Sequence, residues 1–265
     1  MATVLHPSQP GVTPVADVWT VVKTVDFKSQ TTVDLTASGD TTYTLSGGQD
    51  VISDGTSTGD VDLTNGTGIV INKTSGGHTA IGILLSTISG YVLADDNVVQ
   101  WIVKIDDFPQ TGSSIGNCLA AYMTVNDATS SPFAGNWHAD GFTSTHSGDT
   151  NSHNFRTACI AATGGLDAGA ITTDVVYDGY VLFTMFLVGG GEVLRAFIET
   201  RATDTFVAPE DVTATPTNST NQTAASDSLT GMGSLVAWLD AYDPGSAMQI
   251  TITQFRLLTR TGFPS

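Results

Sequence analysis

The sequence predicts an all-β protein built as an antiparallel β-sandwich, with an extended N-terminal arm and long polar loops. Three observations predict this class. β-Branched and aromatic residues recur in runs of strand length, and clusters of Gly, Asp, Asn and Ser separate these runs. Glutamate, which favours helix interiors, occurs only as Glu192, Glu199 and Glu210. Gly, Thr and β-branched residues interrupt every stretch that could form an amphipathic helix.

The chain divides into an arm and one domain. Residues 1–16 are predicted to be an extended arm, because Pro7, Pro10 and Pro14 punctuate a segment without a regular pattern. Such an arm gains order by lying on the body of the protein or on a neighbouring subunit. Residues 17–265 are enough to bury the core of a single β-sandwich domain.

Strand patterns run through most of that domain. The segment 181–188, three glycines and the segment 192–199 predict a long hairpin, because the glycines supply the positive φ angles of a tight turn. Val-Asp-Leu-Thr occurs at 33–36 and again at 61–64, which indicates either a duplicated hairpin or a chance repeat. The predicted strands are 18–27, 31–36, 41–45, 68–72, 80–88, 98–105, 119–125, 157–162, 171–177, 180–188, 192–199, 235–239 and 248–258.

Two long polar segments interrupt the strands, and both are predicted to be loops. Residues 126–154 carry Phe133, Trp137 and Phe142, so aromatic anchors should order this loop. Residues 203–230 are almost free of aromatic side chains, which is typical of a linker-like excursion.

The charge of the chain limits its partners. Its 26 acidic residues outnumber 9 basic ones, for a formal net charge of −17, and all but three of the acids are Asp. Because Asp favours turns, we expect the negative charge to lie at the loops that join the strands. Such a surface repels nucleic acid and anionic membranes. No basic segment followed by an apolar run marks a signal peptide at the start, so we expect synthesis in the host cytoplasm and release as part of an assembly.

From about Val18 onward the order of features is similar to the concanavalin-like (laminin-G-like) jelly-roll modules of bacteriophage virion structural proteins. The matching segments are the opening strand 19–27, the strand entry 95–105, the hairpin 180–199 and the closing strand 248–258. Richness in Thr, Gly and Asp with few Lys and Glu adds to the likeness. The resemblance implies a concanavalin-like jelly roll exposed on a phage particle.

No motif in the sequence has the context that catalysis requires. A glycosidase of this fold needs two carboxylates on one strand face, commonly both Glu, and the three glutamates form no such motif. The Gly-x-Ser-x-Gly pattern occurs at 55–59 and at 112–116, but the chain lacks the alternation of strands and helices that a nucleophile elbow needs, and no phosphate-binding loop occurs. We therefore expect no enzymatic activity and no catalytic residues.

Metal binding is a weaker alternative, and no cofactor is expected. Oxygen-rich loops could hold calcium, although aspartates that bond to their own turns explain the same pattern. His138, His146 and His153 share a loop with Asp140 and Asp149, but their spacing fits no standard site. The candidate calcium loops contain Asp54, Asp60 and Asp62; Asp95, Asp96 and Asn97; and Asp149 and Asn151.

A candidate contact site lies in the first long loop. Asn136, Trp137, His138 and Asp140 combine an aromatic platform with polar groups, as sugar-binding sites do. Trp137 could equally be a buried anchor for the loop. Trp19, Trp101 and Trp238 lie in predicted strands and are expected in the core. Cys118 and Cys159 are expected to be buried thiols, with one disulfide as the alternative.

These patterns predict a non-enzymatic structural protein on the outer surface of a phage virion, most simply a capsid decoration (cement) protein. Its expected partners are the major capsid protein or other virion proteins and copies of itself, as a homotrimer by analogy with virion symmetry. The alternative is a tail or fibre adhesin that binds host glycans through the 126–154 loop.

Overall fold

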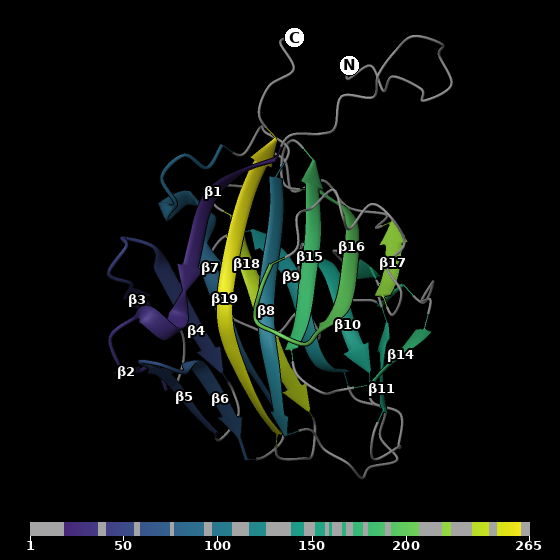
Figure 1. The fold of residues 1–265 in the computed structure, drawn as a ribbon, viewed down its shortest axis with the longest axis horizontal. Coiled ribbons are helices and arrows are strands. Elements are labelled where there is room, and N and C mark those ends of the chain that lie inside the picture. The colour runs from purple at the N-terminus through teal and green to yellow at the C-terminus, as the bar shows by residue number, and fades with distance from the viewer. Residues whose placement is uncertain are drawn as a thin grey trace, which may run out of the picture.

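The fold is a sandwich of two antiparallel β-sheets, as the computed structural model shows (Figure 1). The predicted all-β class is confirmed. The arm predicted at 1–16 lies outside the described residues. The structure describes residues 19–36, 41–55, 59–74, 77–92, 97–107, 117–125, 139–145, 152–156, 159–160, 166–167, 172–176, 180–188, 192–206, 219–223, 235–243 and 248–260.

Within these residues nine strands form the first sheet, the nine-stranded sheet. Eight of them lie in one continuous order, and β1 (Trp19–Asp26) pairs with β19 beside that path. The order is β17 (Ser219–Thr223), β16 (Glu192–Arg201), β15 (Tyr180–Val188), β8 (Asn97–Asp107), β19 (Met248–Arg260), β6 (Gly68–Lys73), β5 (Gly59–Thr64) and β2 (Val33–Asp34).

The second sheet, the eight-stranded sheet, lies behind the first in Figure 1. Two short strands, β12 (Cys159–Ile160) and β13 (Leu166–Asp167), pair separately. The described helices are the 3-10 turns η1 (Phe27–Ser29) and η2 (Leu85–Thr87), and none is long or apolar enough to cross a membrane. The order of the eight strands is β14 (Thr172–Val176), β11 (Ser152–Arg156), β10 (Ala139–Thr145), β9 (Asn117–Val125), β18 (Leu235–Asp243), β7 (Gly77–Leu84), β4 (Asp50–Gly55) and β3 (Thr41–Thr44).

The core lies between the sheets, because alternate residues of each strand point inward. Trp101 of β8 is fully buried there. Its ring stacks on Phe27 at 6.5 Å between centroids and meets Phe255 edge-on at 4.7 Å. The indole N–H of Trp101 has no hydrogen-bond partner, so this side chain stabilises the fold by packing.

Strand β19 organises the nine-stranded sheet. It pairs with β8 along one edge, and its other edge is shared between β1 and β6. At the junction Gly68 has φ +119°, and a Cβ there would overlap the carbonyl oxygen of Ile252. Glycine is therefore required where β6 approaches β19.

Some side chains on the outer faces of both sheets are also buried. In the nine-stranded sheet Ile102 and Leu182 alternate with core residues, point outward and are still fully buried. In the eight-stranded sheet Trp238 points outward at 2% exposure, and its ring lies against Gly82. Of the tryptophans predicted in the core, Trp101 lies there, Trp238 is buried on the outer face, and Trp19 is only half-buried.

Four sequence-based expectations need correction. The predicted loop 126–154 contains β10 and the first residues of β11, and the predicted loop 203–230 contains β17. These strands are polar, so they lack the apolar alternation by which strands were identified. The candidate calcium loop that contains Asp54, Asp60 and Asp62 is partly strand, since β4 extends to Gly55 and β5 begins at Gly59.

The expected position of the acidic residues is the fourth correction. Many described aspartates lie within strands and not in turns, among them Asp34 in β2 and Asp60 and Asp62 in β5. Asp60 and Asp62 alternate with the core residues Val61 and Leu63, so they point to the outer face, and Asp34 lies opposite Asp62. Asp34 and Asp60 are exposed there, and Asp62 is half-buried.

Candidate functional site

The predicted contact site is only partly within the described residues. Asn136, Trp137 and His138 lie outside them. Asp140 is the second residue of β10, where its backbone pairs with Met123 of β9. The grouping of these four residues therefore stays a prediction. Of the three loop histidines, only His153 is described, in β11 opposite Val175.

The candidate calcium loop at 54–62 is divided between the two sheets. Asp54 pairs with Ala80 in the eight-stranded sheet, whereas Asp60 and Asp62 belong to the nine-stranded sheet. Of the other candidates, Asn97 is buried at the start of β8 and the rest lie outside the described residues. Among the residues described, no three His, Cys, Asp or Glu side chains gather where they could hold a metal ion.

Asp34, Asp60 and Asp62 form the aspartate row on the outer face of β2 and β5. Asp34 and Asp62 lie directly opposite each other in the register of the two strands. Burial raises the pKa of Asp62, and the negative charges of Asp34 and Asp60 raise it further. Like charges placed opposite each other in a sheet are destabilising, so the row weakens this corner at neutral pH.

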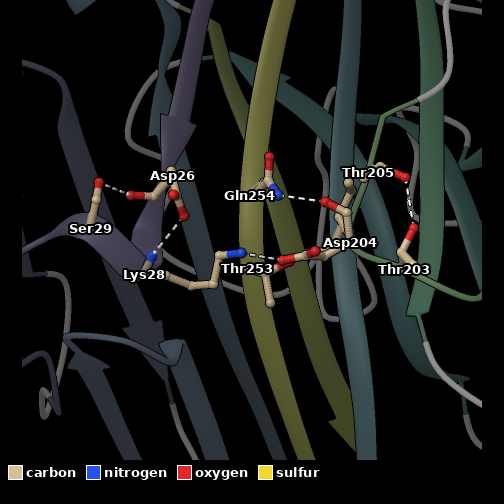
Figure 2. Close-up of polar contacts among 9 residues, drawn as sticks. Asp26, Lys28, Ser29, Thr203, Asp204, Thr205, Thr253 and Gln254 are labelled. Carbon is tan, nitrogen blue, oxygen red and sulfur yellow. Dashed lines mark hydrogen bonds and ion pairs between the residues drawn. The ribbon is translucent and has the colours of Figure 1, made fainter.

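A short segment crosses the outer face of the nine-stranded sheet. After β16 ends at Arg201, residues 202–206, here called the strap, pass in front of β8 and reach β19 (Figures 1 and 2). The carboxylate of Asp204 forms an ion pair with Lys28 of η1. Gln254 of β19 donates its side-chain N–H to the carbonyl oxygen of Asp204 at 2.5 Å. The strap thus connects the end of β16 to the seam between β1 and β19.

A second set of contacts holds the far end of the strap. The guanidinium of Arg256 lies 4.3 Å from the ring centroid of Phe206, a cation–π contact. The same guanidinium donates twice to the side-chain oxygen of Gln100, from Nε at 2.9 Å and from Nη2 at 2.5 Å. Gln100 in turn donates to the hydroxyl of Thr184 at 3.0 Å. Gln100 and Thr184 are fully buried, and these hydrogen bonds satisfy their side-chain polar groups.

The ion pair is reflected in the protonation of both partners. The hydrogen bond from Lys28 lowers the pKa of Asp204, and the same bond raises the pKa of Lys28. Partial burial opposes both changes by disfavouring the charged forms. Both groups therefore stay charged at neutral pH. The contacts around Asp204 and Arg256, here called the strap cluster, hold the strap against the sheet. The strap cluster contains no nucleophile activated by a neighbouring base.

Sequence reasoning did not find this cluster. Lys28 and Asp204 are 176 residues apart, and neither belongs to a motif. Asp204 lies in a segment that was expected to be a linker. The one feature of the sequence that points to it is the scarcity of Lys and Arg. The chain has only nine of these residues, so a salt bridge made by any of them is a candidate structural contact.

Comparison with known proteins supports the fold. No known protein family matches the sequence, and neither does any curated protein sequence. Among solved structures, the lectin UEA-II in complex with galactose is 11% identical, with a TM-score of 0.50 over 80% of this chain and 93% of the lectin. The predicted jelly-roll sandwich is thus confirmed as lectin-like, and this likeness establishes the fold alone.

Two phage proteins are also similar at lower scores. A carbohydrate esterase from the Shiga toxin-encoding bacteriophage phi24B is 12% identical, with a TM-score of 0.44 over 92% of this chain and 100% of the esterase. The CBM2 module of the evolved Dit protein of Lactobacillus casei BL23 phage J-1 is 10% identical, with a TM-score of 0.44 over 93% of this chain and 98% of the module. At these scores neither likeness carries an argument about function.

Proposed function

We propose that the protein is a non-enzymatic structural component on the outer surface of a phage particle, most simply a capsid decoration protein. Its partners are then the major capsid protein and further copies of the chain. Sequence features support this proposal through the resemblance to virion jelly-roll modules, and the structure supports it through the distribution of charge.

The acidic exterior of the sandwich is the observation that carries the proposal. On the outer face of the nine-stranded sheet, Asp34 and Asp60 of the aspartate row are exposed and Asp62 is half-buried. By contrast, Lys28 and Lys104 are each paired with an aspartate, and Arg256 is bound to Gln100 and Phe206. With a net charge of −17, such a surface suits the outside of a shell and not contact with packaged DNA.

Co-purification tests the proposal. Phage particles released by lysis of cells that express the chain are purified on a density gradient and analysed for this protein. We expect the chain to band with the particles at a fixed ratio to the major capsid protein. Its absence from washed particles would contradict a structural role in the virion.

The second candidate is a tail or fibre adhesin that binds host glycans. The specific observation in its favour is the fold, which in UEA-II carries a bound galactose. Replacing Trp137 and His138 by Ala separates the two candidates. Loss of cell adsorption with unchanged particle stability would support the adhesin, whereas a less stable particle with normal adsorption would support decoration.

A further inference from the structure

We propose that the strap opens and closes over the outer face of the nine-stranded sheet, and that the Lys28–Asp204 ion pair controls this equilibrium. This inference is independent of where the protein lies in a particle, because it depends only on contacts within the chain.

Polar contacts hold the strap in place. They include the ion pair with Lys28 of η1, the bond from Gln254 of β19 and the cation–π contact with Arg256. Its residues 202, 203 and 205 are exposed. The strap is not a strand of the sheet, so it can leave the surface without breaking a β-ladder.

The ion pair is accessible to solvent. The side chains of Lys28 and Asp204 keep 32% and 25% of their accessible surface. Ions in solution can therefore screen this attraction more than they screen a fully buried pair. Since Asp204 is the only charged residue among 202–206, removing its charge leaves the strap without ionic attachment.

The surface beneath the strap differs from the exposed parts of the sheet. Ile102 of β8 lies between Gln254 of β19 and Leu182 of β15 in the register of the sheet. Ile102 and Leu182 are fully buried although they point away from the core. Gln100 and Thr184, which pair with each other two residues further along β8 and β15, are also fully buried. Opening the strap would expose part of this apolar and polar strip to water and to other molecules.

Hydrogen exchange measured by mass spectrometry on the purified full-length protein tests the inference. In Asp204→Asn we expect the amides of residues 202–206 to exchange about three-fold faster than in the wild type. Lys28→Gln should give the same increase, and the double variant should exchange no faster than either single variant. About 0.5 M NaCl should raise exchange in the wild type and have little effect in Asp204→Asn.

Asp106→Asn is the matched control. It removes the same charge from the Lys104–Asp106 ion pair, which joins two residues of β8 on the same sheet. This variant should leave exchange of residues 202–206 unchanged. The amides of β8 and β19 report whether each variant is folded, since opening of the strap alone leaves them protected.

Three outcomes would overturn the inference. One is exchange of the strap amides that is complete at the earliest time in the wild type. The second is identical exchange in the wild type and Asp204→Asn. The third is an equal acceleration in Asp106→Asn, which would show a general effect of net charge.

Discussion

Gly68 shows how one residue fixes the position of a strand. Its φ of +119° is unfavourable for any side chain, and the carbonyl oxygen of Ile252 occupies the space that a Cβ would need. Gly66, two residues earlier, also has a positive φ of +84° but faces open space. The two positions therefore separate backbone strain from steric overlap.

We expect Gly68→Ala to lower the free energy of unfolding by about 3 kcal/mol, since strain and overlap act together. Gly66→Ala should cost about 1 kcal/mol, from the positive φ alone. Urea denaturation of the two variants measures the difference. Equal losses would show that the contact with Ile252 does not constrain β6.

Replacing Asp62 or Asp204 by Asn removes one negative charge, and we expect the two replacements to change the stability of the protein in opposite directions. The pKa of Asp62 is raised, so its charged form is less favourable in the folded state than in the unfolded chain. Asp62→Asn should therefore stabilise the protein at pH 7 by about 0.2–0.5 kcal/mol, and the gain should vanish as the pH falls below about 4. The pKa of Asp204 is lowered in the folded state, so its charged form stabilises the fold. This stabilisation is fully present above the pKa of an Asp in the unfolded chain, and it is lost as the pH falls through the pKa of Asp204 in the folded state.

Thermal unfolding of Asp62→Asn and Asp204→Asn between pH 3 and pH 7 compares the two signs. At pH 7 Asp204→Asn should be less stable than the wild type by about 0.5 kcal/mol, because its ion pair is partly exposed. If both variants changed stability in the same direction, net charge would explain the result better than local contacts.

At the scale of elements, β1 pairs with β19 from Trp19 to Asp26, and its C-terminal end is anchored in the core. Its residues face solvent for much of its length, and Val21 is 48% exposed. At its C-terminal end η1 turns the chain, and Phe27 enters the core against Trp101. The side chain of Asp26 accepts a bond from the backbone N–H of Lys28 at 3.1 Å and fixes this turn.

Phe27→Ala should therefore lower the free energy of unfolding by about 3–5 kcal/mol, since it leaves a cavity beside Trp101. Val21→Ala on the preceding strand is the control and should change stability by less than about 0.5 kcal/mol. Chemical denaturation followed by tryptophan fluorescence measures both. A small loss in Phe27→Ala would mean that the aromatic contacts do not hold β1 in place.

The strongly apolar elements were predictable from the sequence, and the polar ones were not. Strand β15 is found with the predicted bounds, and its hairpin with β16 is confirmed. Polar β17 and β10 could not be recognised, because only their backbone pairing with neighbouring strands identifies them. The strap escaped prediction for the same reason, since its contacts join Asp204 to residues distant in the sequence.

The two Val-Asp-Leu-Thr segments illustrate a pattern whose meaning needed the structure. The first copy pairs antiparallel with the second, which places Val33 opposite Leu63 and Asp34 opposite Asp62. The repeat therefore sets hydrophobic residues on one face and acids on the other across both strands. The sequence alone showed the repeat but not that its copies are neighbours.

At the scale of the whole molecule, charge decides which partners the surface accepts. An excess of 17 negative charges predicts no affinity for duplex DNA. An electrophoretic mobility assay at low salt should show no shift of the duplex at any protein concentration. A shift that weakens as salt rises would reveal a basic surface and contradict the proposed outward position.

Antibody labelling of phage particles examines that outward position directly, because an antibody cannot pass through a closed shell. Particles that contain the chain are labelled intact and after disruption, and both samples are imaged by electron microscopy. Strong and regular labelling of intact particles is the result expected for a surface component. If the antibody bound only after disruption, the protein would lie inside with the genome, and its proposed role in the particle would be wrong.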